Sequence, residues 1–280
     1  MRADFFAAHH FRILMLAIAL GLAGALAWKS YEDAHRREAP GRSDAVEARA
    51  PSRPSPAAVA TRRGEIESLF AGAQPFAGFF ARLKQTFPAD WNRILDTLAR
   101  QGATPGETDS AANYVSDILR ILRRDRGIVA SRAGPEAMAA VFEAQARLLS
   151  TLAVGDKRVC VDFLMGQPSP AFLDLVARNA SQLADLANAT LAAIIDGGAR
   201  KIDREAPSDA DFDLLATALT NRGLGKSEIE VLLDGRLPDP PLPDAILCDA
   251  GLVYFDALKS LPDDVRARMY ALAIQAMGKS

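Results

Sequence analysis

Histidine is scarce in this chain of 280 residues, and its distribution is uneven. The three histidines, His9, His10 and His35, all precede residue 64, so residues 64–280 contain none. That stretch therefore cannot form a Ser-His-Asp triad, a Cys-His dyad, a histidine metal site or an HExxH zinc motif. It also lacks a glycine-rich phosphate loop and a GxSxG nucleophile elbow. We expect it to hold neither a metal ion nor a cofactor.

Cysteine is almost absent as well, because the chain has only Cys160 and Cys248. Two cysteines that lie 88 positions apart cannot complete a zinc site by themselves, and no CxxC pair is present. Two interpretations remain. If residues 64–280 are exported, an oxidising compartment favours a Cys160–Cys248 disulfide. If they face the cytoplasm, both residues are small buried hydrophobes. We favour the disulfide.

Strand patterns are missing from the sequence. No useful length alternates β-branched or aromatic residues with polar ones, and aromatic residues make up only 7% of the chain. Alanine, leucine and arginine, which are strong helix formers, dominate instead. No internal repeat of fixed period is visible, which argues against a solenoid. We predict an all-α domain, a multi-helix bundle or array, over residues 64–280, with a division into two subdomains near residue 155 or 200 as an alternative.

Several helix ends carry recognisable signals. Pro88 and Gly102 frame one expected helix in the proline-first, glycine-last arrangement. The longest expected helix covers residues 171–198, with Gly197 and Gly198 as its left-handed stop. Ser208, followed three residues later by Asp211, resembles a capping box, and Ser227 is expected to cap the next helix.

The charge is distributed unevenly along the chain. The net charge is −2, but residues 1–63 carry +4 and residues 64–280 carry −6. Binding to nucleic acid requires a basic surface, so the acidic balance of the longer part excludes nucleic acid as the expected partner.

The N-terminus has the features of a membrane segment. A basic flank, residues 1–12, precedes sixteen uncharged residues, 13–28, which would extend about 24 Å as a helix. This run is expected to be a transmembrane anchor. The alternatives are the hydrophobic region of a cleaved signal peptide, because Ala25-Leu26-Ala27 fits a cleavage site, and a buried soluble helix. Residues 29–63, rich in proline, alanine and arginine, are expected to form a flexible, disordered linker.

The orientation of the anchor is ambiguous in the sequence. Five cations follow the apolar run, and the positive-inside rule would keep the large domain in the cytoplasm. Acidic residues are interleaved with these cations, however, and the run resembles an export signal. We expect a single-pass protein of the bacterial inner membrane with residues 64–280 in the periplasm. A cleaved, soluble periplasmic form and a cytoplasmic-facing form remain as alternatives.

Two groups of residues are candidates for function. Arg120, Arg123 and Arg124 share one helical face and could contact an acidic protein partner or lipid headgroups, although cations are also favoured simply at a helix C-terminus. A pair of carboxylates could support glycoside hydrolysis without histidine. The acids available for such a pair include Glu65, Glu107, Glu136, Glu143, Asp162, Asp185, Asp249 and Asp256.

The aromatic-rich stretch at residues 74–91 could line a groove for a partner helix, but packing in the core is its default role.

Taken together, these features favour a non-catalytic, membrane-tethered helical protein that binds a partner in the cell envelope. The alternatives are a carboxylate-dependent envelope hydrolase and a cytoplasmic-facing membrane adaptor.

Overall fold

The computed structural model describes residues 55–101, 110–166 and 169–278. Within these ranges the chain forms twelve α-helices and no strand, which confirms the all-α prediction. The transmembrane or signal segment predicted at residues 13–28 lies outside the described residues, as does the linker before residue 55. The helices are α3 (Pro56–Gly72), α4 (Ala77–Thr86), α5 (Pro88–Gln101), α6 (Ala111–Ala130), α7 (Pro135–Gly155), α8 (Lys157–Leu164), α9 (Pro170–Arg178), α10 (Ala180–Arg200), α11 (Asp209–Thr220), α12 (Lys226–Asp234), α13 (Asp244–Lys259) and α14 (Asp263–Met277).

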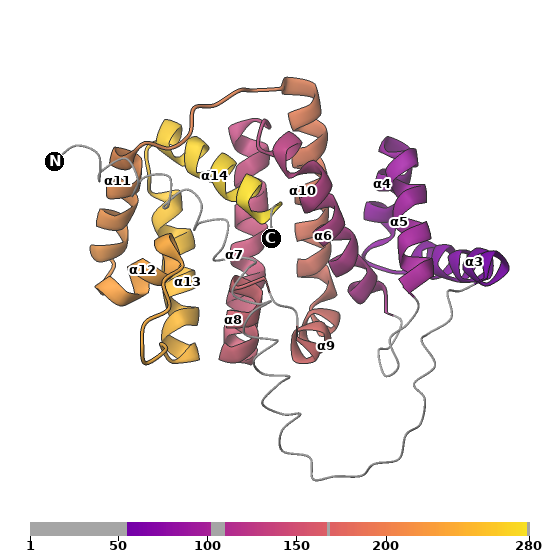
Figure 1. Ribbon diagram of the computed structural model, residues 1–280, viewed down its shortest axis with the longest axis horizontal. Helices are drawn as coiled ribbons and strands as arrows, with labels where there is room; N and C mark the ends of the chain where they lie inside the picture. The colour runs from indigo at the N-terminus through magenta and orange to yellow at the C-terminus, as the bar shows by residue number, and fades with distance from the viewer. Residues whose placement is uncertain (1–54, 102–109, 167–168, 279–280) are drawn as a thin grey trace, which may run out of the picture.

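Three long helices form the centre of the array. Helix α10 packs against both α6 and α7, and α14 crosses them from the α11 side and packs on α6 and α7 (Figure 1). Their inward faces are apolar, with Ile118, Leu148 and Ile194 almost fully buried. Burial of such side chains, each stabilising by roughly 1.5–3 kcal/mol, is the main force that assembles the helices.

Helices α3, α4 and α5 form a unit at one side of the array (Figure 1). An aromatic cluster holds this unit together: the rings of Phe70 and Phe80 stack with centroids 3.9 Å apart, and Trp91 and Tyr114 pack around them. Phe76, Phe79, Phe80 and Trp91 are all buried. The aromatic-rich stretch therefore belongs to the core and does not form an open groove.

The predicted end of the linker at residue 63 is wrong. Helix α3 begins at Pro56, because the Ser55 hydroxyl accepts a hydrogen bond from the Ala58 N–H and Pro56 is suited to the first helical turn. Arg62 and Arg63, which belong to the predicted linker, reach Tyr114 and Asp96 with distances of 3.0 and 2.8 Å. The sequence predicts a helix only from residue 64, and it missed the part of α3 before that residue because that part has few large apolar side chains.

The predicted long helix over residues 171–198 is two helices. The chain breaks at Asn179, whose side-chain amide donates to the Leu175 carbonyl and so competes with the backbone hydrogen bonds of a continuous helix. Gly197 does not end α10 either: the helix continues to Arg200 and ends at Lys201, which has a left-handed conformation with φ 51°. Gly197 instead lies where α10 approaches the backbone of α6.

Among the other predicted helix ends, one prediction is confirmed and others are wrong. The capping box of Ser208 and Asp211 at the start of α11 is present with both hydrogen bonds. Ser227 is not a cap: Gly225 takes that position, and the carboxylate of Glu228 lies against it. Helix α6 continues beyond its arginines to Ala130 and has no basic residue in its last turn, so these cations do not decorate a helix C-terminus.

Helix α7 is the one described helix that is long and apolar enough to cross a membrane by length and composition. Half of its most apolar window is buried, and the helix packs against α8, α10, α13 and α14 in the middle of the array. It has the character of a core helix.

Candidate functional site

The four arginines of α6 have different surroundings. Arg120 forms an ion pair with Asp117 at 2.6 Å, and Arg124 forms one with Asp125 at 2.8 Å. Arg126 donates to Asp90 and lies 5.0 Å from the ring centroid of Phe87. Arg123 has no hydrogen bond or ion pair with any described residue. Three positive charges are thus locally neutralised and one is not.

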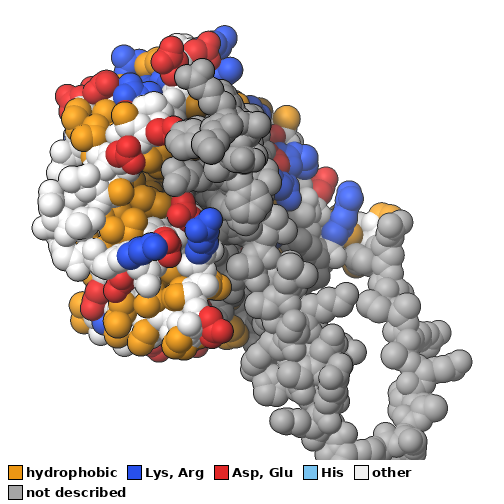
Figure 2. Space-filling model, turned by 60° about the vertical axis from the view of Figure 1, so that its left-hand side comes forward, with side chains coloured by type: hydrophobic (Ala, Val, Ile, Leu, Met, Phe, Trp, Pro, Cys, Tyr) orange, Lys and Arg blue, Asp and Glu red, His pale blue; other side chains and the backbone are white. Residues whose placement is uncertain are grey.

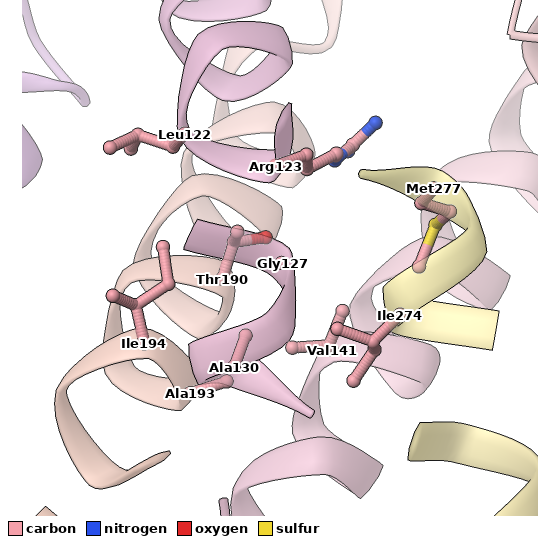
Figure 3. Close-up of a pocket in the computed structure, with 10 residues that line it drawn as sticks. All are labelled: Leu122, Arg123, Gly127, Ala130, Val141, Thr190, Ala193, Ile194, Ile274 and Met277. Carbon is pink, nitrogen blue, oxygen red and sulfur yellow. The ribbon is translucent and has the colours of Figure 1, made fainter. Parts of the chain in front are cut away.

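Arg123 lies at a pocket of about 170 Å³ that is mostly apolar. Figure 3 is a close-up of a smaller, adjacent hollow of about 20 Å³ that shares Arg123 and Met277 with this pocket, and it shows the Arg123 side chain extending from α6 toward Met277 at the end of α14. The pocket is enclosed by side chains from α6, α7, α8, α12, α13 and α14, together with the two residues that follow α8. The lining consists of Arg123, Phe142, Gln145, Phe163, Leu164, Met165, Gly166, Val231, Leu232, Leu247, Tyr254, Phe255, Ala273 and Met277.

No Asp or Glu belongs to the described lining of the pocket, so Arg123 is its only charged group. Its side chain keeps a partly exposed surface. Loss of water around the guanidinium lowers the pKa of Arg123 to about 10, which still leaves it protonated at neutral pH. A desolvated cation without a facing anion is unfavourable for the protein, because the lost hydration is not replaced.

Two uncharged polar side chains share the pocket. Burial, assisted by the nearby Tyr270, raises the pKa of Tyr254 to about 12, so its phenol remains a hydrogen-bond donor at neutral pH. The amide of Gln145 is buried and donates to the sulfur of Met277 at 3.1 Å, and sulfur is a weak acceptor. A small number of polar groups in an apolar hollow is the usual composition of a small-molecule site.

The two cysteines lie beside this pocket. Their sulfur atoms are 2.07 Å apart and their Cα atoms 5.7 Å apart, which is the spacing of a disulfide. The pair joins α8 to α13, two helices that supply walls of the pocket. Gly251 of α13 lies close to Leu164, since a Cβ atom at Gly251 would fall 2.4 Å from a Leu164 methyl carbon.

The acids next to the cysteines have structural partners. Asp249 lies 2.6 Å from Lys157 Nζ, and this ion pair again connects α13 with α8. Asp162 is buried and lies 3.2 Å from Arg158 Nε within α8. Neither acid lines the pocket of Arg123.

A second, more open hollow of about 440 Å³ has carboxylates at its surface. Glu143 of α7 and Asp256 of α13 both line it, beside Arg147 and Lys259. These are the described acids from the sequence-based set that come together at one depression. On the face shown in Figure 2, acidic and basic side chains are intermixed, with hydrophobic patches between them.

Sequence reasoning identified Arg123 but not its pocket. Lining residues lie between positions 123 and 277 on six helices, and no local motif marks them. The only signal in the sequence was the grouping of Arg120, Arg123 and Arg124 on one helical face. Comparison of the chain with protein-family models, with curated proteins and with solved structures returned no match.

Proposed function

We propose that this protein is a membrane-tethered helical binding protein of the bacterial cell envelope, without catalytic activity, whose helical domain lies in the periplasm. One observation carries the binding function: the pocket of Arg123 combines an apolar lining with an uncompensated cation and two further donors, and its described lining contains no Asp, Glu, His, Cys or Lys. Such a composition suits the binding of a ligand.

The paired cysteines support the proposed compartment. Disulfides persist in the periplasm and are rare in the cytoplasm, where thiols are kept reduced. Cys160 and Cys248 are both fully buried and are placed within bonding distance of each other. The apolar run at residues 13–28 supports a tether to the inner membrane.

Two measurements test this assignment together. Alkaline phosphatase or green fluorescent protein is fused after Ser280, and the thiols of the denatured, unreduced protein are labelled. The proposal expects an active phosphatase, a dark fluorescent fusion and no labelled thiol. A bright fluorescent fusion with two labelled thiols would instead support the cytoplasmic-facing adaptor. The mass of the mature N-terminus separates a retained anchor from a cleaved signal.

The second candidate is an envelope hydrolase that uses Glu143 and Asp256. The observation in its favour is that both carboxylates line one open hollow. The test is hydrolysis of peptidoglycan by the wild-type protein and by Glu143→Gln and Asp256→Asn variants. The binding proposal expects no turnover from any of them, whereas turnover by wild type that both variants abolish would favour the hydrolase.

A further inference from the structure

We propose that the pocket of Arg123 binds a single-chain anionic amphiphile, an acyl carboxylate of medium chain length, with its headgroup at Arg123 and its chain among the apolar side chains. This inference rests on the proposed binding function and specifies its ligand. The features that support it are the charge of the pocket, its lining, its size and its polar donors.

The charge of the pocket selects an anion. The other three arginines of α6 each have a carboxylate partner, so the chain supplies acids where it neutralises a surface cation. Arg123 faces a hollow whose described lining has no acid at all. A carboxylate bound there would restore the interactions that the guanidinium lost with water, and the planar guanidinium matches a carboxylate with two parallel hydrogen bonds.

The remainder of the lining selects an apolar chain. Phe142, Phe163 and Phe255 contribute aromatic rings, and Leu164, Val231 and Leu247 contribute branched aliphatic surface. A short polar anion such as phosphate or acetate would satisfy Arg123 but would leave this surface unfilled. An amphiphile satisfies both parts of the pocket, because each buried methylene group adds to the affinity.

The size of the pocket selects one chain of moderate length. An apolar cavity of about 150 Å³ is sufficient to bind benzene. The volume here, about 170 Å³, is only slightly larger, so it accommodates part of one acyl chain. A lipid with two long chains would exceed it, so we assign the ligand to single-chain carboxylates.

Tyr254 and Gln145 supply the remaining polar contacts. Both line the same pocket as Arg123. The Tyr254 hydroxyl makes no hydrogen bond with another described residue. The Gln145 amide donates one hydrogen bond to the thioether sulfur of Met277. Both groups can donate to carboxylate oxygens without losing a strong partner, and this makes them positioning donors for the headgroup.

The test is photolabelling of the full chain in phosphatidylcholine nanodiscs with a decanoate probe that carries a diazirine in its chain. Labelled peptides are mapped by mass spectrometry, so probe dissolved in the bilayer does not contribute to the signal at the pocket. We expect labelling on α8, α12 and α13 residues that line the pocket. Unlabelled decanoate should compete, whereas decyltrimethylammonium at the same concentration should not.

Matched variants isolate the role of the charge. Arg123→Met should reduce labelling of the pocket by roughly tenfold or more, since it removes a charge-assisted hydrogen-bonding partner. Arg123→Lys should retain part of the labelling. Arg120→Met, on the same helix but paired with Asp117 at the surface, should leave it unchanged.

Stability measurements show whether a variant with reduced labelling is still folded. Removal of an unpaired, desolvated cation should not lower the thermal midpoint of the ligand-free protein, so Arg123→Met should unfold at or above the wild-type temperature. Equal labelling of wild type and Arg123→Met, equal competition by the cationic amphiphile, or absence of labelling at the pocket would each overturn the proposal. The compartment assignment would survive these outcomes, because the thiol and fusion measurements test it separately.

Discussion

Gly197 of α10 faces the backbone of α6 so closely that a Cβ atom at this position would lie 1.9 Å from the carbonyl oxygen of Val129. Backbone atoms cannot move away as a flexible side chain could. Gly197→Ala should therefore force the two central helices apart and destabilise the protein by about 1–3 kcal/mol. Urea denaturation followed by circular dichroism measures this change.

The neighbouring glycine provides the matched control. A Cβ atom at Gly198 would meet only a methyl carbon of Val129, at an ordinary distance of 3.8 Å. Replacement of a helix-interior glycine by alanine stabilises a helix by roughly 0.5–1 kcal/mol. Gly198→Ala should thus be neutral or stabilising, and an equal loss of stability in both variants would contradict the close approach of α10 and α6.

Asp211 makes stability dependent on acid pH. Its buried carboxylate accepts hydrogen bonds from Arg268 Nε at 2.9 Å and from Arg268 Nη2 at 2.8 Å, and these bonds together with the Ser208 N–H lower its pKa to about 2. Because the pKa is lower in the folded state, the contribution is complete above about pH 4. It is lost as the pH falls from about 4 to 2, and amounts to about 2 kcal/mol.

Asp211→Asn should therefore lower the unfolding free energy at pH 7 and flatten its decline between about pH 4 and 2. Asp264 offers the control, because it also contacts Arg268, at 3.2 Å, but its side chain is 71% exposed. An exposed ion pair contributes little, so Asp264→Asn should retain the wild-type pH profile. Denaturant titrations at several pH values decide between these outcomes.

The Cys160–Cys248 pair should account for a large part of the stability. A cross-link across 88 positions stabilises by about 4–5 kcal/mol in the chain-entropy model. Reductant should lower the denaturation midpoint of the wild-type protein, and a Cys160→Ala/Cys248→Ala variant should show the lower midpoint with or without reductant. A wild-type midpoint that does not respond to reductant, measured after thiol reduction is verified, would argue against this contribution.

Alanine substitutions at two exposed glycines of helix α3 should change the stability by different amounts. Gly64 lies in the middle of α3, and a Cβ atom added there would have no other atom within 4 Å, whereas Gly72 is the last residue of the helix. Gly64→Ala should stabilise the protein by roughly 0.5–1 kcal/mol, and Gly72→Ala should have a smaller effect. Thermal denaturation of the two variants beside the wild type measures the difference. No stabilisation at Gly64 would instead fit a domain that starts after a disordered linker, as the sequence alone indicated.

The sequence was sufficient where local chemistry decides the structure. Pro88 marked the start of α5, and Ser208 with Asp211 marked the start of α11. The break at Asn179 was not visible, because the apolar stripe continues through it. Gly197 resembles a stop signal in the sequence, which does not reveal that another helix backbone lies against it.

The candidate site was harder to predict than the helix ends, because it is formed by side chains from several helices. Spacing alone placed Arg120, Arg123 and Arg124 together, and their sequence contexts are similar. They differ in their contacts. Arg120 and Arg124 form ion pairs with nearby acids, whereas Arg123 lies among aromatic and aliphatic side chains from other helices. Long-range packing of this kind leaves no periodic signal in the sequence.

The connection between Cys160 and Cys248 also has a topological consequence. When bonded, the two residues close a covalent ring that contains α9, α10, α11 and α12, while α14 and the helices before α8 lie outside it. The largely exposed, proline-rich segment at residues 235–243 lies within the ring. A protease cut there would open the ring while the disulfide still joined the two fragments, so on a denaturing gel they would migrate as one species until reductant is added.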